Sequence, residues 1–181
     1  MYNIYEQHKY NEELICSPWN PGVFISDTDN FVTLMYAKAY AEREHLGIEE
    51  AARVLRYEFL EKTAQEFGCN KIATAHNADD NAETVLLNLT RGSGAKGLCG
   101  IPPVRGVFIR PLLDKSREEI EHYLLENNVP HVEDSTNAEN EYSRNKIRHF
   151  VMPVLSEINP AFSGAVMRTT QLMRDDEECL S

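Results

Sequence analysis

The sequence predicts an α/β fold, a partial doubly wound parallel sheet with a small helical extension at its C-terminal end. Three observations predict this fold class. Short apolar segments alternate with helical patterns through the middle of the chain, which is typical of parallel sheets. Glycines and a capping motif separate these segments by short loops. After residue 134 only helical patterns remain.

The chain is expected to have three parts. The first 35 residues carry no sustained periodicity apart from a short strand pattern at residues 23–25, and they receive no fold assignment. Residues 36–138 are predicted to form the α/β domain. Residues 139–181 are predicted to form the helical extension, with a boundary near residues 135–142.

Two helices open the α/β domain. The first is predicted over residues 36–45 and is expected to end at Gly47. The second is predicted over residues 48–67, with acidic residues in its first turn and Gly68 as its C-cap. Its apolar face is expected to contain Leu55, Phe59 and Leu60.

A buried strand is predicted next, at residues 71–75. Residues 76–89 then predict a turn that enters a helix, closed by Gly92 and Gly94. Another strand is predicted at residues 107–112.

Ser116 and Glu119 match the S-x-x-E capping box, which predicts a helix from there to about residue 126. A last strand is predicted at residues 130–132.

The extension is expected to contain two helices, over residues 145–155 and 160–178. Breaks are expected at Pro153 and at Asn159 with Pro160, because proline interrupts a helix.

Composition excludes several classes of protein. The 181 residues contain no apolar run near ~18 residues, which excludes a membrane span, and no basic start followed by an apolar core, which excludes a secretory signal. The four cysteines are far apart without a C-x-x-C pair, which argues against a disulfide framework or a cysteine-based metal site and favours a reducing cytoplasm. With a net charge of −11, any nucleic-acid role would depend on a local basic strip or on a part not present.

The most informative segment, AHNADDNAET, follows the strand at residues 71–75 and opens a helix. At 3.6 residues per turn its polar side chains are predicted to share one face. They are His76, Asp79, Asp80, Glu83 and Thr84. The carboxyl end of a strand is where α/β sheets bind ligands, and paired carboxylates suit Mg²⁺. The alternative is that Asp79 and Asp80 only cap the helix.

Two further segments carry positive charge. In R-G-S-G-A-K-G-L, Arg91 and Lys96 with three glycines are candidates for binding phosphate, and the alternative is a simple helix end and loop. In R-N-K-I-R, Arg144 and Arg148 are four residues apart and are predicted to share a helix face that binds phosphate or carboxylate. The alternative is an exposed basic helix start paired with nearby glutamates.

Arg53 and Arg56 form a fourth candidate group. They are placed to reach nucleotide phosphates, or else only to pair with Glu49 or Glu50 on the surface of their own helix.

Together these motifs resemble the tRNA(Ile)-lysidine synthetase family of the PP-loop ATP pyrophosphatases. The resemblance runs from about Tyr36 to about Phe162. It rests on segments in the family's order, at residues 49–57, 75–84, 91–98, 101–103, 110–113, 134–137 and 142–148. The family implies an adenine nucleotide alpha hydrolase-like fold that binds ATP and Mg²⁺. The R-G-S-G-x-K-G-L and R-N-K-I-R segments favour lysidine synthesis over the related thiolation of tRNA.

The resemblance implies a ligase that joins free L-lysine to the wobble cytidine of tRNA(Ile) through an adenylated intermediate. It implies catalytic roles for Asp79, Glu83 and Arg144, with Asp79 and Asp80 as metal ligands. Contacts to the nucleotide are implied for His76, Asp80, Arg53, Arg56, Arg91, Lys96 and Arg148.

One family feature is missing. The family opens with a strand and a Ser-Gly-Gly-x-Asp-Ser loop that cradles the pyrophosphate of ATP, whereas residues 1–35 hold a single glycine, Gly22. We therefore expect the N-terminal part of the domain to be missing and this polypeptide alone not to hydrolyse ATP. An internal fragment, a truncated gene product and a degenerate paralogue all agree with this pattern.

Other functions stay open. A tRNA-thiolating relative is one, and the absence of C-x-x-C argues against it. A non-catalytic remnant that binds a partner is another. If the lost strand belonged to the sheet centre, an exposed edge would remain, and such an edge favours a homodimer.

Overall fold

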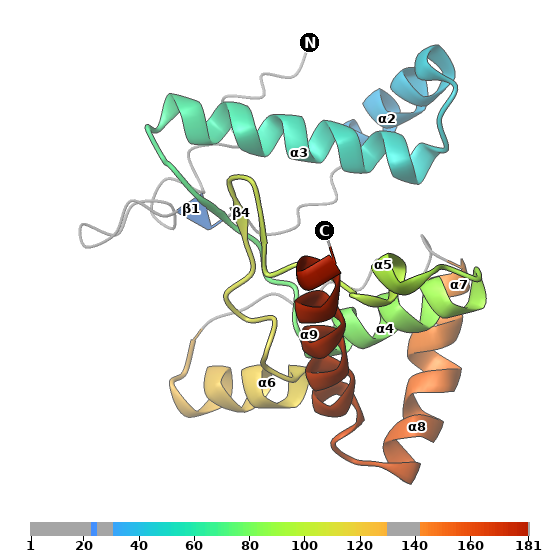
Figure 1. Cartoon of the computed structure of the whole chain (residues 1–181). Coiled ribbons are helices and arrows are strands. Elements are labelled where there is room, and N and C mark those ends of the chain that lie inside the picture. Colours follow the sequence, from blue (N-terminus) through green and yellow to red (C-terminus); the bar gives the residue numbers. More distant parts are fainter. Residues whose placement is uncertain (1–22, 25–30, 130–141, 181) are drawn as a thin grey trace. The chain divides into compact units, whose positions relative to one another are not determined.

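The computed structural model describes residues 23–24, 31–129 and 142–180 (Figure 1). By its internal contacts the chain divides into two compact units. The first consists of Met1–Thr74 and Val104–Ile109, and the second consists of Ala75–Pro103 and Arg110–Ser181. The predicted strand at residues 130–132, the motif at residues 134–137 and most of the predicted domain boundary lie outside the described residues.

The first unit contains the sheet. Its strands are Val23–Phe24 (β1), Ile72–Ala73 (β2), Val104–Arg105 (β3) and Phe108–Ile109 (β4), in the order β1-β2-β4-β3. β2 pairs in parallel with β1 and with β4, whereas β3 pairs antiparallel to β4. The α/β class with a mostly parallel sheet is therefore confirmed.

The antiparallel hairpin was not predicted. It joins β3 to β4 through a two-residue turn, in which Gly106 adopts a φ of 61°. Hairpins with two-residue turns favour glycine at such a position. The strand predicted at residues 107–112 is therefore shorter than expected and forms the second arm of this hairpin.

Two helices of the first unit precede β2, namely Phe31–Glu44 (α2) and Ile48–Glu66 (α3). α3 ends as predicted, because Gly68 has a φ of 65° and Cys69 N donates to Ala64 O at 2.7 Å, which completes a Schellman motif. The end of α2 differs from the prediction. His45, with a φ of 56°, leaves the helix, and Gly47 is instead the N-cap of α3.

The core of the first unit lies between α3 and the sheet. Leu60 and Ala64, one helical turn apart, pack against Ile72 and Phe108. The ring of Tyr57 lies 4.6 Å from that of Phe108. The predicted apolar face was wrong at Phe59, which is 44% exposed, because two-residue strands cover only a narrow stripe of α3.

The second unit begins with Ala78–Thr90 (α4), Ala95–Leu98 (α5) and Arg117–Glu126 (α6). The capping box of α6 is confirmed, since Ser116 Oγ accepts from Glu119 N at 3.1 Å and Glu119 Oε2 accepts from Ser116 N at 2.7 Å. This bond from Ser116 N–H lowers the pKa of the Glu119 carboxyl. Its contribution to helix stability is present above the unfolded-state pKa and is lost as the pH falls through the lowered value.

The helices that follow are Tyr142–Lys146 (α7), a π-helix at Ile147–Val151 (η2), Met152–Ile158 (α8) and Phe162–Leu180 (α9). The break predicted at Pro153 was wrong, because helix runs from Tyr142 to Ile158. Met152 N–H donates to the Ile147 carbonyl five residues back. We attribute the continuity to this wider turn, which relieves the clash of the Pro153 ring with the preceding turn.

The break predicted at residues 159–160 is confirmed, with an angle of 92° between the flanking helical segments Ser143–Ile158 and Phe162–Cys179. In the described part of the chain, no single helix combines the length and apolarity needed to cross a membrane. That bent pair passes the same test of length and composition only when its two segments are taken together.

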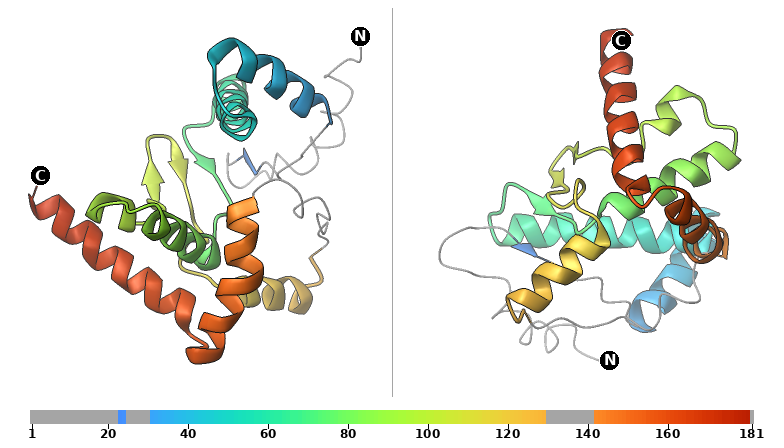
Figure 2. Two further views of the ribbon diagram at one scale, coloured as in Figure 1. Left: turned by 90° about the vertical axis from the view of Figure 1, so that its right-hand side faces the viewer. Right: turned by 90° about the horizontal axis from the view of Figure 1, so that it is seen from below.

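Buried polar groups hold α9 against α4, alongside which it runs (Figure 2). Asn81, with no exposed surface, accepts from Ile101 N at 2.8 Å and donates to Thr170 Oγ1 at 3.4 Å. Arg174 donates to the carbonyls of Cys99 and Ile101 at 2.9 and 3.3 Å, and its burial lowers the pKa of its guanidinium. α9 is therefore an integral part of this unit.

Gly100 offers a test of this packing. It has a φ of 66°, and a Cβ there would lie 2.3 Å from Asn81 Oδ1. Gly100→Ala should lower the free energy of unfolding by about 3 kcal/mol or more, since it combines backbone strain with the loss of a buried hydrogen bond. Gly92→Ala is the matched control, with a φ of 71° but open space around it, and should cost about 1 kcal/mol. Equal losses in urea denaturation would contradict the packing described.

Candidate functional site

The candidate site is built at the start of α4, which follows β2 along the chain. Asn77 is the N-cap, and its side chain accepts from Asp80 N at 2.9 Å. Asp80 Oδ2 in turn accepts from Asn77 N at 3.0 Å. This capping box orients the Asp80 carboxylate and leaves Oδ1 directed elsewhere.

Glu83, one turn later, is the most buried carboxylate of the site, with its side chain 3% exposed. Its Oε2 accepts from Arg144 Nε at 2.9 Å and from Arg148 Nη2 at 2.9 Å. Its Oε1 accepts from Arg148 Nε at 2.6 Å. Two guanidinium groups therefore satisfy both oxygens of one buried carboxylate.

Asp80 completes the group. Its Oδ1 lies 3.5 Å from Arg144 Nη2 and 3.4 Å from Arg148 Nη2. We call Asp80, Glu83, Arg144 and Arg148 the arginine–carboxylate cluster. Its two positive and two negative charges balance. The side chains of Asp80, Arg144 and Arg148 are only 21 to 28% exposed, so solvent screens the attraction between these charges less than on an open surface.

Apolar contacts position the two arginines. Ile147 and Met152, which flank the π-helix turn, pack with Ala82 in the core between this helix and α4. Arg144 and Arg148 lie on the same helical segment, four residues apart, which places both guanidinium groups over Glu83. π-helical turns occur frequently at functional sites.

Asp79 points to different partners, although it is adjacent to Asp80. Its Oδ2 accepts from Arg117 N, the first N–H of α6, at 2.7 Å. Its Oδ1 accepts from Ser163 Oγ of α9 at 2.6 Å. In the reverse direction Ala78 N, the first N–H of α4, donates to Lys115 O at 2.8 Å. The starts of α4 and α6 therefore cap each other, and Asp79 links both to α9.

Comparison with known proteins establishes the family. The family model for the PP-loop domain matches residues 24–155. The chain belongs to the PP-loop family. This PP-loop chain is similar to the tRNA(Ile)-lysidine synthase of Thermosipho africanus, with 52% identity over 129 residues that cover 71% of this chain and 30% of that protein. The tRNA(Ile)-lysidine synthase of Thermotoga maritima is 43% identical over 166 residues, which cover 90% of this chain and 38% of that protein.

The resemblance drawn from the motifs is thus confirmed, and the PP-loop chain spans about a third of the length of these curated relatives. Among solved structures, the U34-tRNA thiolase NcsA from Methanococcus maripaludis is similar, with a TM-score of 0.53 and 20% identity. The similarity covers 67% of this chain and 42% of that chain, and it supports the fold alone.

Some predicted residues of the PP-loop chain do not join the cluster. Arg91 is exposed at the other end of α4, about 17 Å from Asp80 at 1.5 Å per residue, and Lys96 is exposed in α5. Two glycines of this segment have structural roles. Gly92, with a φ of 71°, follows the C-cap of α4, and a Cβ on Gly97 would lie 2.5 Å from Ser93 Cβ.

Arg53 and Arg56 are exposed on α3, in the first unit, and Arg53 lies 3.8 Å from Glu50. His76 is half-buried just before the N-cap of α4. The single polar face predicted for residues 76–84 is therefore divided, since Asp79 contacts α6 and α9 while Asp80 and Glu83 contact the arginines.

The contacts of Asp79 and Asp80 do not favour a metal ion held between them. All four oxygens accept hydrogen bonds from N–H or O–H groups, and those on Asp80 Oδ1 come from guanidinium groups. Within residues 23–24, 31–129 and 142–180, no group of three or more His, Cys, Asp and Glu side chains is arranged to hold a metal.

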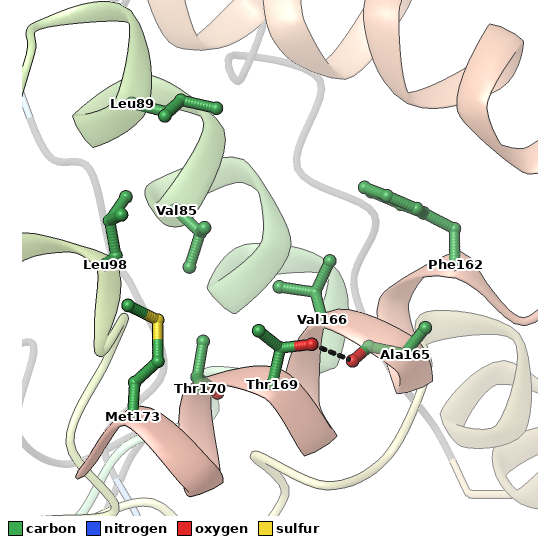
Figure 3. A pocket seen from close by; sticks show the side chains of 9 residues that line it. All are labelled: Val85, Leu89, Leu98, Phe162, Ala165, Val166, Thr169, Thr170 and Met173. Carbon is green, nitrogen blue, oxygen red and sulfur yellow. Dashed lines mark hydrogen bonds between the residues drawn. The ribbon is translucent and has the colours of Figure 1, made fainter. Parts of the chain in front are cut away.

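An apolar pocket of about 290 Å³ lies between α4, α5 and α9 (Figure 3). Leu89, Leu98, Phe162 and Met173 contribute to its lining. The hydroxyl of Thr169, also in the lining, donates to the Ala165 carbonyl at 3.1 Å. Without a charged side chain in its lining, the pocket suits neither a phosphate nor an ammonium group.

Sequence reasoning missed two residues that support the site, Ser163 and Asn81, and the burial of a third residue, Arg110. Ser163 contacts Asp79, Asn81 joins α4 to α9, and Arg110 is a buried arginine. Single serines and asparagines carry no pattern that would reveal a long-range partner. Arg110 belongs to one of the family segments, but its burial cannot be inferred from that segment.

Asp79→Ala should lower the free energy of unfolding by about 2 kcal/mol, because the substitution removes the acceptor for Arg117 N–H and Ser163 Oγ. Ser163→Ala should cost about half as much. Asp114→Ala is the control, since that side chain is 67% exposed, and should change the value by less than about 0.5 kcal/mol. If Asp79→Ala matched this control in urea denaturation, the linking role of Asp79 would be wrong.

Proposed function

We propose that the chain carries the site at which a tRNA(Ile)-lysidine synthase joins lysine to an activated cytidine. The observation that carries this proposal is the arginine–carboxylate cluster, in which carboxylates suited to an amine lie against guanidinium groups suited to phosphate. The names of the relatives at 43 to 52% identity support the choice of reaction. Because the chain spans about a third of those relatives, the complete activity is proposed for the site in the context of a longer protein.

The proposed reaction has two steps. The C2 oxygen of the wobble cytidine in tRNA(Ile) attacks the α-phosphorus of ATP, and pyrophosphate leaves. The amine of free L-lysine then attacks C2, the C2–O bond breaks, and AMP leaves with that oxygen. The amine loses protons in this step, so a base near it is required.

The cluster supplies groups for both steps. Glu83 and Asp80 are proposed to bind the lysine ammonium, and Glu83 to accept a proton from it. Arg144 and Arg148 are proposed to stabilise negative charge on the α-phosphate and on pyrophosphate. Since each of the two carboxylates contacts both arginines, an amine has to displace a guanidinium from Glu83.

The other residues that the resemblance assigns to nucleotide binding are proposed to contact phosphates or the nucleotide, without an assigned partner atom. His76, which precedes the N-cap of α4, is proposed to contact the nucleotide. Four further cations are exposed, and their exposure agrees with contacts to ATP or to tRNA phosphates; they are Arg53, Arg56, Arg91 and Lys96. Magnesium is proposed to arrive on the phosphates of ATP, because the oxygens of Asp79 and Asp80 already accept hydrogen bonds.

The alternatives have less support. Thiolation of tRNA shares the fold, as the structural neighbour illustrates, but in the described ranges Cys69, Cys99 and Cys179 are free thiols outside any metal-binding group. A non-catalytic binding module would lack ATP binding in a calorimetric titration. A cytoplasmic location and a homodimer are also proposed, and light scattering that finds a monodisperse monomer would contradict the dimer.

The function is tested by a chimera in which this chain replaces the matching segment of the Thermotoga maritima relative while that protein's own N-terminal residues are kept. The chimera should transfer labelled lysine to tRNA(Ile) in an ATP-dependent reaction. Glu83→Ala in the chimera should lower the rate at least ~100-fold, because the site loses its amine ligand and base. Glu118→Ala on the exposed side of α6 is the control and should retain the rate. Full activity of the Glu83→Ala chimera, measured by lysine incorporation, would refute the assignment.

If an amine displaces a guanidinium from Glu83, the binding of an amine and the binding of a phosphate should each raise the affinity for the other. An amine that takes Glu83 leaves guanidinium groups uncompensated, which strengthens their attraction for phosphate. Saturating pyrophosphate should therefore raise the affinity of the chain for lysine about tenfold, measured by calorimetry. Arg144→Gln with Arg148→Gln should remove this dependence. Equal lysine affinities with and without pyrophosphate would contradict the exchange.

A further inference from the structure

Arg110 is a buried cation for which the described part of the chain provides no counter-ion. It is 7% exposed and directly follows β4 along the chain. Nη1 donates to the Pro102 carbonyl at 2.6 Å, whereas Nε is buried without a hydrogen-bond partner. Among residues 23–24, 31–129 and 142–180, no carboxylate lies within ion-pair distance of this guanidinium.

This arrangement is costly for the folded chain. A buried charge without a partner destabilises the folded state of a protein. Arg174 in the same unit illustrates the usual solution, since it donates to two carbonyls and to Thr170 Oγ1. An unsatisfied buried group of this kind requires an explanation, and a bound anion is one that also balances the charge.

The free edge of Arg110 has the geometry of an anion site. With Nη1 held by Pro102, Nε and Nη2 form the edge of the guanidinium from which two parallel N–H bonds emerge. This edge matches two oxygens of a phosphate. Arg110 also follows the carboxyl end of β4, a strand parallel to β2, and α/β sheets bind ligands at the carboxyl ends of their strands.

We propose that Arg110 binds a phosphate group of a ligand through Nε and Nη2, at a site separate from the arginine–carboxylate cluster. The inference rests on the proposed function only in taking nucleotide or pyrophosphate as the source of that phosphate. A phosphate of the tRNA backbone is the other source of the same chemistry.

The test measures thermal unfolding of the full chain in sodium pyrophosphate against sodium chloride of equal ionic strength. Pyrophosphate at about 100 times its Kd should raise the midpoint of the wild type by about 5 °C or more. Arg110→Met should lose at least two thirds of this rise. Without pyrophosphate this variant should unfold at or above the wild-type temperature, because it removes an unpaired buried charge.

Two further variants distinguish pyrophosphate binding at Arg110 from binding at the arginine–carboxylate cluster. Arg105→Met changes the charge equally at an exposed position and should respond to pyrophosphate like the wild type. Arg148→Gln tests the arginine–carboxylate cluster. If only Arg148→Gln loses the response, the Arg110 inference is wrong while the proposed function stands. If only Arg110→Met loses it, the inference stands and the phosphate role of the cluster is wrong.

A second measurement uses the wild-type protein and therefore tests the inference even if Arg110→Met fails to fold. In wild-type protein labelled with ¹⁵N-arginine, the Nε–Hε resonance of Arg110 should move downfield on titration with pyrophosphate, with Arg110→Lys used for its assignment. Movement with an RNA hairpin alone would also support the site and identify the nucleic-acid backbone as the source of phosphate. An unmoved resonance with both probes, or no thermal response in the wild type, would overturn the inference.

Discussion

Burial of the Glu83 carboxylate between two arginines is the constraint on which the site depends. The side chain is 3% exposed, so its charge needs partners from within the protein. Arg144 and Arg148 provide them from a segment more than 60 residues away, as the sequence separations of 61 and 65 indicate. Loss of either partner would leave part of a buried charge unbalanced, and α4 and the α7–η2 helix are therefore fixed to each other by electrostatics as well as by the apolar contacts of Ile147 and Met152.

Adjacent acidic residues at the start of α4 have separate structural roles. Asp80 faces the arginines, while Asp79 accepts hydrogen bonds from α6 and α9. Asn81, the next residue, faces the buried polar contacts of α9. Three consecutive polar residues thus have different sets of partners within the unit, although Asp79 and Asn81 both contact α9.

The sequence predicted what local physical chemistry decides. The capping box at Ser116 and the glycine that ends α3 follow from backbone hydrogen bonding within a few residues, and both are confirmed. Helical spacing placed Arg144 with Arg148 on one face, as in the structure, but it also placed Asp79 with Asp80 and Glu83, from which the structure separates it. The sequence could not establish that acidic and basic residues touch, since contact between Glu83 and Arg148 depends on the packing of a distant helix. The exposure of Phe59, the β3–β4 hairpin and the burial of Arg110 likewise depend on tertiary neighbours that no short pattern contains.

The π-helical turn has a consequence for sequence change. Ile147 and Met152 occupy the same side of the helix with a five-residue spacing that only the wider turn allows. Deletion of one residue between them would shorten this spacing to the four residues of an ordinary α-helical turn, which also keeps both ends of the segment on one side of the helix. The wider turn therefore accommodates one residue more than the register of the flanking helix requires.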